Sequence, residues 1–307
     1  MSPIDFSVVI AVHNGERTLK RAIDSILAQT LPPREVIVVD DGSTDASAEI
    51  AAGYGAPVRV LRQQNRGAAA ARNAGVAAAR GNWIAFLDAD DYYYPRRLEL
   101  AAEAVRRFPD ADFVTADFDY RDEGGNLLRR SLESTVLGAR LLQENSPFVL
   151  MESRDFGVFI EDHFGDTHTL TLPRETFLRL GGYPEGFAVC EDVHFLIRLC
   201  LASQHAAVVA QPVAAYVIHP NSATRSDSLR AQRQTVAAWR SLKPLLAQAS
   251  APLRAGYRRG LARARYNLAV ALLRAGSRWE AVQAVLPLLH EAPSLNSLRI
   301  LASVVKG

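Results

Sequence analysis

A short acidic segment, Asp88-Ala89-Asp90-Asp91, concentrates negative charge directly after an apolar run. That run, Trp83 to Leu87, predicts a buried strand. Because neighbouring carboxylates repel one another unless a cation lies between them, the segment indicates a divalent metal, Mg²⁺ or Mn²⁺, which commonly binds together with phosphate oxygens. The alternative is an acidic turn in which Asp91 caps the following helix.

A second acidic pair, Glu191-Asp192, lies in the second half of the chain and begins a predicted helix from Asp192 to Ala202. A helix N-terminus stabilises an ionised carboxylate. Such a carboxylate can accept a proton from a reacting hydroxyl, so the pair is a candidate for general base catalysis. Simple capping of the helix is the alternative.

Isolated polar residues follow or interrupt other apolar segments. Asp40 ends the apolar run from Glu35, and His13 and Glu16 follow the first apolar run of the chain. Arg72 is the single charged residue in a segment of mostly alanine, and His219 follows an apolar run near residue 218. Charged side chains in these positions point to a polar site rather than to core packing.

Apolar runs and helix-like segments alternate from residue 6 to about residue 120, and they must position these side chains. The alternation predicts an α/β fold with a Rossmann-like, mostly parallel sheet flanked by helices. In such sheets, ligands bind beyond the carboxyl ends of the strands. The predicted strands are Phe6 to Val12, Glu35 to Asp40, Val58 to Leu61 and Trp83 to Leu87, and the predicted helices are Thr18 to Ala28, Asp45 to Ala52 and Ala68 to Ala79.

The pattern is less regular between residues 122 and 168, where we expect helices and loops on the acceptor side of the site. Residues 167–172 are predicted to be extended and residues 173–180 helical. Two further strands are predicted, Ala206 to Val209 and Val213 to Ile218.

Four segments in order resemble the family-2 glycosyltransferases, which are inverting enzymes of the GT-A fold. The segments are Ser7 to Asn14, Val38 to Asp45, Asn65 to Gly75 and Asp88 to Asp91. The resemblance covers roughly residues 5–220. It implies a nucleotide-sugar donor, most commonly a UDP-sugar, a divalent metal (Mn²⁺ or Mg²⁺), and an acceptor hydroxyl on a glycan or lipid-linked saccharide. Ala11-Val12-His13 departs from the family, in which Pro-Thr-Tyr is frequent, but relatives contact the base there mainly through the backbone.

The resemblance also implies which residues bind the donor. Asp40 accepts a hydrogen bond from the uracil N3–H, Arg72 reaches the nucleotide, and Asp88 contacts the ribose. Glu16 helps to hold the base pocket. The full set of implied donor-binding residues is Ala11, His13, Glu16, Asp40, Arg72, Asp88 and Ala89.

Metal binding and catalysis follow from the same resemblance. Asp90 ligates the metal between the two donor phosphates, and His219 lies near it; an imidazole ligand would favour Mn²⁺ somewhat over Mg²⁺. Glu191-Asp192 resembles the family's Glu-Asp signature, so Asp192 is the expected base and Glu191 a supporting residue.

The net charge of +2 in 307 residues hides a division of the chain. The segment from Arg230 to Gly307 holds 13 Lys and Arg against 2 Asp and Glu, a local balance of +11. We therefore expect two modules: a GT-A domain over residues 1–227, with a nucleotide-binding half (1–120) and an acceptor-binding half (121–227), and a basic helical region over residues 228–307. Two cysteines without ligand spacing, and the lack of a signal peptide, predict a cytoplasmic protein.

The basic region resembles a tetratricopeptide unit from Arg263 to Pro293, with its turn at Gly276. A single unit cannot bury both faces, so it must pack on neighbouring helices or on a partner. Its charge favours an anionic membrane surface, at the inner face of the cell membrane, or a protein partner. Nucleic acid is not expected, and arginines that only solvate the helices are an equal alternative.

Other nucleotide-binding classes lack their signatures here. The turn after the first strand reads His13-Asn14-Gly15-Glu16-Arg17, which is not the glycine-rich turn of a dehydrogenase, and the chain has no P-loop. A nucleotidyltransferase would carry a glycine- and lysine-rich loop near its start. The remaining alternative is a catalytically silent protein that binds a nucleotide-sugar, a membrane or a partner through its basic helices.

Overall fold

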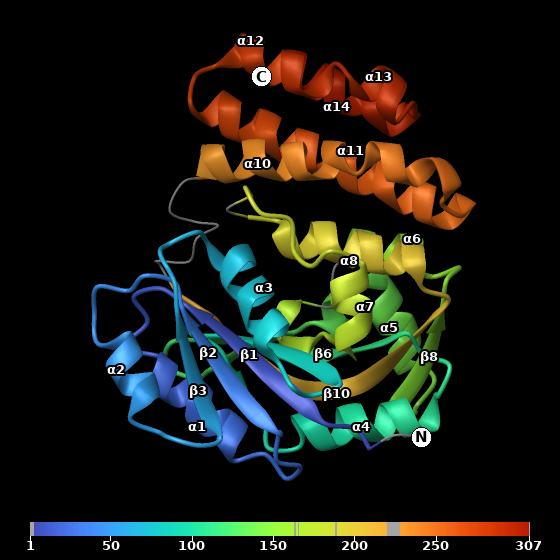
Figure 1. Cartoon of the computed structure of the whole chain (residues 1–307). Helices are drawn as coiled ribbons and strands as arrows, with labels where there is room; N and C mark the ends of the chain where they lie inside the picture. The colour runs from blue at the N-terminus through green and yellow to red at the C-terminus, as the bar shows by residue number, and fades with distance from the viewer. Residues whose placement is uncertain (1–2, 163, 165, 188, 220–227, 307) are drawn as a thin grey trace.

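The computed structural model describes residues 3–162, 164, 166–187, 189–219 and 228–306. It shows one mixed sheet flanked by helices, with a layer of further helices above it (Figure 1). The predicted fold class, an α/β protein with an all-α C-terminal extension, is confirmed.

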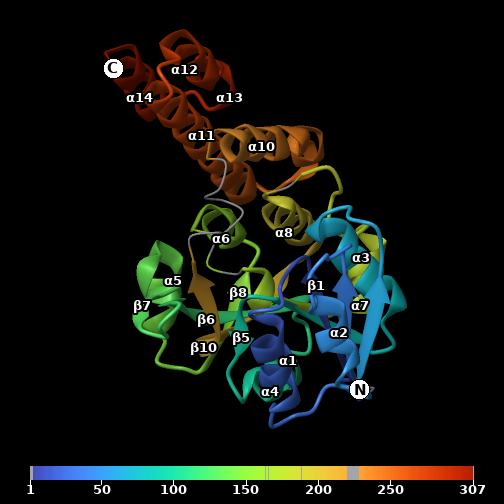
Figure 2. The same cartoon turned by 90° about the vertical axis from the view of Figure 1, so that its left-hand side faces the viewer.

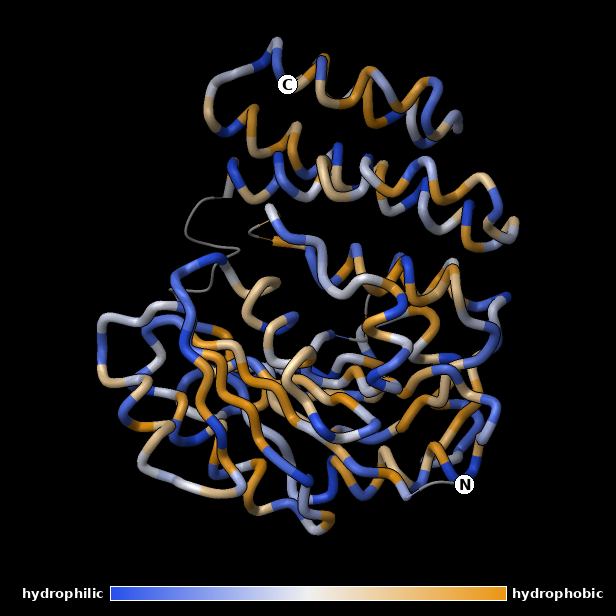
Figure 3. Tube along the Cα trace, in the orientation of Figure 1, coloured by the Kyte–Doolittle hydropathy of each residue, from blue (hydrophilic) through white to orange (hydrophobic). Residues whose placement is uncertain are grey.

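The N-terminal half of the sheet is parallel, as predicted. Its strands lie in the order β3-β2-β1-β4. Every residue of β2 and nearly all of β1 are buried, because helices cover both faces, and the apolar residues run along these central strands (Figure 3). The elements are β1 (Phe6–Val12), α1 (Leu19–Leu27), β2 (Glu35–Asp40), α2 (Ser47–Ala52), β3 (Val58–Arg62), α3 (Ala68–Ala78) and β4 (Trp83–Asp88).

Small residues bring α3 close to the sheet. A Cβ atom on Gly75 would overlap with Cγ1 of Val9 and lie 3.2 Å from Cγ2 of Val39, so a larger residue does not fit without movement. This close contact fixes the position of Arg72, which lies one turn earlier on the same helix.

The other half of the sheet mixes parallel and antiparallel pairs. β9 pairs antiparallel with β4, and β6 runs parallel to β10. β5 and β8 pair antiparallel with β10, and β7 with β6. The elements are β5 (Tyr92–Tyr93), α4 (Arg97–Arg107), β6 (Phe113–Asp122), β7 (Leu127–Arg130), α5 (Val136–Leu142), β8 (Phe148–Glu152), α6 (Phe156–Asp162), β9 (Thr171–Pro173), α7 (Arg174–Arg179), α8 (Glu191–Ala202) and β10 (His205–Ile218).

Three sequence predictions in this half are wrong. The two strands predicted at 206–209 and 213–218 are one strand, β10, because register shifts around Pro212 accommodate the missing N–H without ending the strand. The region 122–168 holds strands β7 and β8 as well as helices. Residues 167–169 form a 3₁₀ turn, so only the end of the segment predicted as extended is a strand.

The C-terminal helices pack on the sheet domain through α11. A Cβ atom on Gly256 of α11 would overlap with the carbonyl oxygen of Gly157 in α6, so the two helices are in backbone contact. Trp239 of α10 packs over Gly260, and the Tyr257 hydroxyl donates to the Trp239 carbonyl at 2.8 Å. The helices are α10 (Ser228–Ser241), α11 (Ala251–Arg274), α12 (Arg278–Val285), α13 (Leu288–Glu291) and α14 (Leu295–Lys306) (Figure 2).

The predicted hairpin from Arg263 to Pro293 has its turn at Gly276, which has a φ of +77°. Its first arm, α11, starts earlier than predicted, and its second arm divides into α12 and α13. The expected boundary at residue 227 lies outside the described residues. Within the described part of the chain, no helix has the length and apolarity needed to cross a membrane.

Candidate functional site

A cavity of about 1130 Å³ opens where β1 and β4 end. Both halves of the sheet line it. The lining from the N-terminal half includes Ala11 to Thr18, Arg72 and Asp88 to Asp90, and the opposite lining includes Tyr120, Arg129, Asp166, Glu191, Asp192 and Tyr216 to His219. The structure thus brings most of the predicted site residues to one place.

The loops after β1 and β2 are joined by hydrogen bonds that shape one wall of the cavity. The backbone N–H of Asn14 donates to Oγ of Ser43 at 2.9 Å, and the side-chain Oδ1 of Asn14 accepts from the backbone N–H of Thr44 at 2.8 Å. Oε2 of Glu16 accepts from the N–H of Ala46 at 3.2 Å. Glu16, predicted to hold the base pocket, therefore joins the two loops.

His13 and Ala11 lie on the same wall. Nδ1 of His13 is 3.0 Å from the carbonyl oxygen of Asp41, and because a carbonyl only accepts, this nitrogen carries the proton in the contact. Ala11 is paired with Asp88 across β1 and β4. Ala11 thus lies beside the acidic segment, and His13 lines the same cavity two residues later.

Asp40 is fully buried at the end of β2 and is not part of the cavity lining. Its Oδ1 accepts from the Ser43 N–H at 3.1 Å, and its Oδ2 lies 3.2 Å from Nε of Arg62. The Arg62 side chain is 62% exposed and can move aside. The contact of Asp40 with a uracil stays a prediction.

The next residue, Asp41, has a structural role that the sequence analysis missed. Its carboxylate accepts hydrogen bonds from Nε2 of Gln63 at 2.7 Å, from the Arg66 N–H at 2.9 Å and from the Gly67 N–H at 2.7 Å. These bonds order the loop that leads into α3. The Asp40-Asp41-Gly42 turn was the available signal, because carboxylates in such turns commonly bind backbone amides.

Arg72 joins the two acidic motifs. Its Nη2 donates to Oδ1 of Asp88 at 2.6 Å and its Nη1 to Oε1 of Glu191 at 2.7 Å. The side chain is buried and lies 5.4 Å from the ring centroid of Tyr183. Arg72 was predicted to reach the nucleotide; here its charge is shared between carboxylates from β4 and α8.

The charges in this cluster shift one another's pKa values. Burial lowers the pKa of Arg72, but Asp88 and Glu191 raise it by more, so the guanidinium stays charged. Burial would raise the pKa of Asp88, and the adjacent Arg72 reverses this and holds it below its usual value. For Glu191 burial outweighs Arg72, and its pKa is raised. Asp88 is therefore the more firmly ionised of the two partners.

Asp90 and His219 form the second polar pair of the cavity, with Nε2 of His219 2.7 Å from Oδ2 of Asp90. Their side chains are 41% and 20% exposed. Across the described residues, no three His, Cys, Asp or Glu side chains form a group that could hold a metal alone. The pair still fits a divalent ion, because such ions often take one or two protein ligands and complete their shell with substrate phosphate oxygens.

Asp91 does not cap the following helix, which begins at Arg97, so the capping alternative given for Asp91 is wrong. Its Oδ1 accepts from the N–H of Val217 in β10 at 2.8 Å, and its Oδ2 lies 3.6 Å from Nδ1 of His168. Burial raises the pKa of Asp91, as do Asp90 and Asp88, and burial lowers that of His168 to about 4. Asp91 thus ties the end of β4 to β10 just before His219.

Glu191 and Asp192 reach the cavity from the first turn of α8. The helix begins at Glu191, directly after Cys190, whose φ of +67° turns the chain into the helix. Oδ1 of Asp192 accepts from the Val193 N–H at 2.7 Å. Its carboxylate lines the cavity, where it can meet an incoming hydroxyl group.

The aromatic wall opposite the loops after β1 and β2 was not predicted. Tyr120, Arg129 and Tyr216 line the cavity from β6, β7 and β10. The alternation of Phe118, Asp119 and Tyr120 is typical of a strand with two different faces, and it was the signal available in the sequence.

Comparisons with known proteins relate the chain to a protein family. The sequence model of Glycosyl transferase family 2 matches residues 7–177, more than half of the chain. The succinoglycan biosynthesis protein ExoO of Rhizobium meliloti (strain 1021) is 34% identical over 228 residues, which cover 74% of this chain and 64% of that protein. An uncharacterized glycosyltransferase of Rickettsia conorii is 35% identical over 134 residues, 43% of this chain and 22% of its own. The chain thus spans less than two thirds of either relative.

The fold is also that of a solved structure. The crystal structure of S. aureus TarS 1-349 in complex with UDP-GlcNAc superposes with a TM-score of 0.68, at 17% identity, over 98% of this chain and 90% of that one. At this identity the likeness establishes the fold alone.

Proposed function

The chain belongs to glycosyl transferase family 2, and we propose that it transfers a sugar from a UDP-sugar to a hydroxyl group of a glycan or lipid-linked acceptor, with inversion at the anomeric carbon. One observation carries the proposal: the carboxylates of Asp88, Asp90, Glu191 and Asp192 line a single cavity together with His219. Clustered acids from separate elements in a concave site are typical of catalysis rather than of folding.

The donor would lie along the wall formed by the loops after β1 and β2. Ala11, His13 and Glu16 border that wall, and Asp40 lies behind it. We propose that Asp88 and Ala89 contact the ribose and that Arg72 acts on the donor through Asp88, which it orients. The structure of TarS with UDP-GlcNAc supports a uridine diphosphate donor for this fold.

Asp90 and His219 would hold a divalent cation, Mn²⁺ or Mg²⁺, at the donor diphosphate. An oxygen and an imidazole nitrogen are ligands that suit Mn²⁺. When bound, the ion would offset the negative charge that develops on the departing diphosphate.

Asp192 would act as the general base. Its carboxylate takes the proton of the acceptor hydroxyl while that oxygen bonds to the anomeric carbon. The bond from this carbon to the diphosphate breaks on the opposite side, and its electron pair leaves with UDP. Glu191, fixed by Arg72 at 2.7 Å, would hold the start of α8 and thereby the position of Asp192.

We also propose that residues 1–227 form the catalytic domain and that the basic helices 228–307 place it on an anionic membrane surface. The charge of the region and the 72% exposure of Trp279 support this, because interfacial helices combine basic and aromatic residues. In a flotation assay, the whole protein should bind to vesicles that contain anionic lipid at low salt and dissociate from them at high salt. Equal binding of the protein to neutral vesicles would contradict the proposal.

Transfer is tested by incubating the protein with UDP-sugars and measuring UDP release and the anomeric configuration of the product by NMR. Asp192→Asn should reduce turnover by about 10²–10⁴-fold with UDP affinity unchanged. Asp110→Asn is the matched control, because Asp110 is exposed and lies outside the cavity. Retained configuration, or an Asp192→Asn variant as active as the control, would refute the mechanism.

A further inference from the structure

Two tyrosines form an aromatic wall on the side of the cavity away from the donor loops. Tyr120 and Tyr216 are paired across β6 and β10, and their ring centroids lie 5.4 Å apart in an edge-to-face arrangement. Phe118 and His168, both buried, pack beneath them, with centroids 4.8 Å from Phe118 to Tyr120 and 5.9 Å from His168 to Tyr216. The tyrosines are therefore fixed from below and partly exposed to the cavity.

Arg129 completes this wall. It is paired with Tyr120 across β6 and β7, and its guanidinium carbon lies 3.8 Å from the centroid of the Tyr120 ring. This stacking uses the face of the guanidinium and leaves its N–H edge available. Among the described residues, no carboxylate pairs with Arg129.

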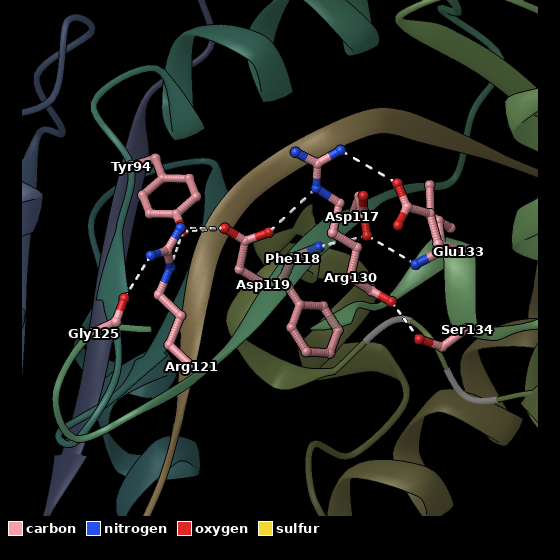
Figure 4. A network of polar contacts seen from close by, with 10 residues as sticks. Tyr94, Asp117, Phe118, Asp119, Arg121, Gly125, Arg130, Glu133 and Ser134 are labelled. Carbon is pink, nitrogen blue, oxygen red and sulfur yellow. Dashed lines mark hydrogen bonds and ion pairs between the residues drawn. The ribbon is translucent and has the colours of Figure 1, made fainter. Parts of the chain in front are cut away.

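The neighbouring arginines, Arg121 and Arg130, are paired with carboxylates. On the other side of the same hairpin, Arg121 donates to Oδ2 of Asp119 at 2.7 Å, and Arg130 lies 3.7 Å from Oδ1 of Asp119 and 3.3 Å from Glu133 (Figure 4). These pairs are internal to the protein. Arg129 alone of the three lines the cavity.

The side chains of this wall suit a ligand that combines a sugar ring with an oxyanion. Flat aromatic faces pack against the C–H face of a sugar ring, and phenol hydroxyls reach its oxygens. A stacked guanidinium with a free edge binds an oxyanion through two parallel hydrogen bonds. Asp166, which also lines the cavity, has interactions of its own, and Glu123 is an exposed residue of the lining.

We propose that Tyr120, Tyr216 and Arg129 form the acceptor subsite, and that the acceptor carries an oxyanion, a phosphate or a carboxylate, close to the sugar that is glycosylated. The subsite rests on the proposed transferase function, because it places the acceptor across the cavity from the donor loops. Arg129 would fix the anionic group, and the tyrosines would support the ring whose hydroxyl faces Asp192.

Binding of three probes by saturation-transfer NMR tests this, with the full chain saturated with UDP and Mg²⁺, which is diamagnetic and does not broaden the probe signals. The probes are methyl α-glucoside, its 6-phosphate, and methyl α-glucuronide. We expect at least one anionic probe to bind at least about ten-fold more tightly than the neutral one, since a hydrogen bond to a charged group commonly contributes that much. Which anionic probe binds more tightly distinguishes phosphate from carboxylate as the source of the oxyanion.

Two substitutions test whether Arg129 causes the preference for anionic probes. Arg129→Gln should remove the preference for anionic probes, whereas Arg130→Gln, a change of the same kind on the same strand, should keep it. Equal binding of the three probes, binding of none, or a preference that survives in Arg129→Gln would overturn the subsite. A titration of UDP with the divalent metal but without the probes separates the two proposals. If UDP does not bind, the donor assignment fails. If UDP binds while the probes are not discriminated, only the subsite fails.

Discussion

At the scale of single residues, the guanidinium of Arg72 stands between Asp88 at the end of β4 and Glu191 at the start of α8. Both ion pairs are largely removed from water. A charge in such a place needs its partners, because an unpaired buried charge is costly. Arg72 therefore has a structural task in addition to any contact with a donor.

Replacing Arg72 by Met should lower the free energy of unfolding by about 3–5 kcal/mol, since it leaves the buried Glu191 and the partly buried Asp88 without their cation. Urea unfolding measures this. Arg66→Met is the control, because the pair of Arg66 with Glu185 is exposed and should contribute less than about 1 kcal/mol. Equal losses in the two variants would contradict the buried-charge account.

Asp117 gives a prediction about pH. Burial raises the pKa of this carboxyl to about 6, although Oδ1 accepts from the N–H groups of Phe118 and Leu132 (Figure 4). Between about pH 4 and 6 the folded chain holds a proton there that the unfolded chain has lost, so this group contributes less stability as the pH rises.

Asp117→Asn keeps the accepting oxygen and removes the ionisation. Relative to the wild type, its free energy of unfolding should rise by about 1–3 kcal/mol between pH 4 and 7. Denaturant unfolding across that pH range measures the difference. A difference that is constant with pH, or that falls, would show that Asp117 does not titrate in this way.

At the scale of elements, the contact of α3 with β1 determines where Arg72 enters the cavity. Gly75→Ala would place a methyl group against Cγ1 of Val9 and should cost about 1–3 kcal/mol in the free energy of unfolding. Gly53→Ala is the control, since its Cβ would approach no atom closer than 3.5 Å. Urea unfolding should separate the two variants, and an unchanged Gly75→Ala protein would contradict the close packing.

The parallel half of the sheet was predictable because its strands are continuous apolar runs between helix-like segments, and the predicted bounds agree within a few residues. The other half was not. β7 is exposed along its whole length and reads Leu-Leu-Arg-Arg, so it lacks the alternation of apolar and polar residues that predicts a strand. β10 contains Pro212 and was predicted as two strands. The pairing of β6 with β10 joins distant segments, which local periodicity does not encode.

In the site, too, some features could be predicted from the local sequence and others could not. The acidic motifs could be read from the sequence because each follows a strand or begins a helix. The contact of Arg72 with Glu191 joins residues 119 positions apart, and the stacking of Arg129 on Tyr120 depends on a hairpin with little sequence signal. Such partners follow from tertiary packing alone.

At the scale of the whole molecule, the C-terminal helices are joined to the sheet domain by a continuous core. Buried residues of α6, α8 and α11 belong to the same apolar cluster as those of the sheet. The sequence predicted helices and a positive charge here, but not that Gly157 and Gly256 bring α6 and α11 into backbone contact.

Gly256→Ala should therefore destabilise the whole chain, by about 1–3 kcal/mol, because the added methyl group meets the backbone of α6. Denaturant unfolding followed by tryptophan fluorescence reports the change at Trp239, which packs over α11. Gly53→Ala again serves as the control. A Gly256→Ala protein as stable as the control would mean that the helices can move apart without loss.

We propose that Asp88, Asp90 and His219 belong to a metal-dependent site for uridine diphosphate. Calorimetric titration of UDP, with and without Mn²⁺, on the wild type, Asp90→Ala and the control Asp110→Ala tests it most directly. We predict binding to the wild type and the control that requires Mn²⁺, and at least about ten-fold weaker binding to Asp90→Ala. UDP binding that is independent of Mn²⁺ and unchanged in Asp90→Ala, or no UDP binding with any divalent metal, would rule out this site.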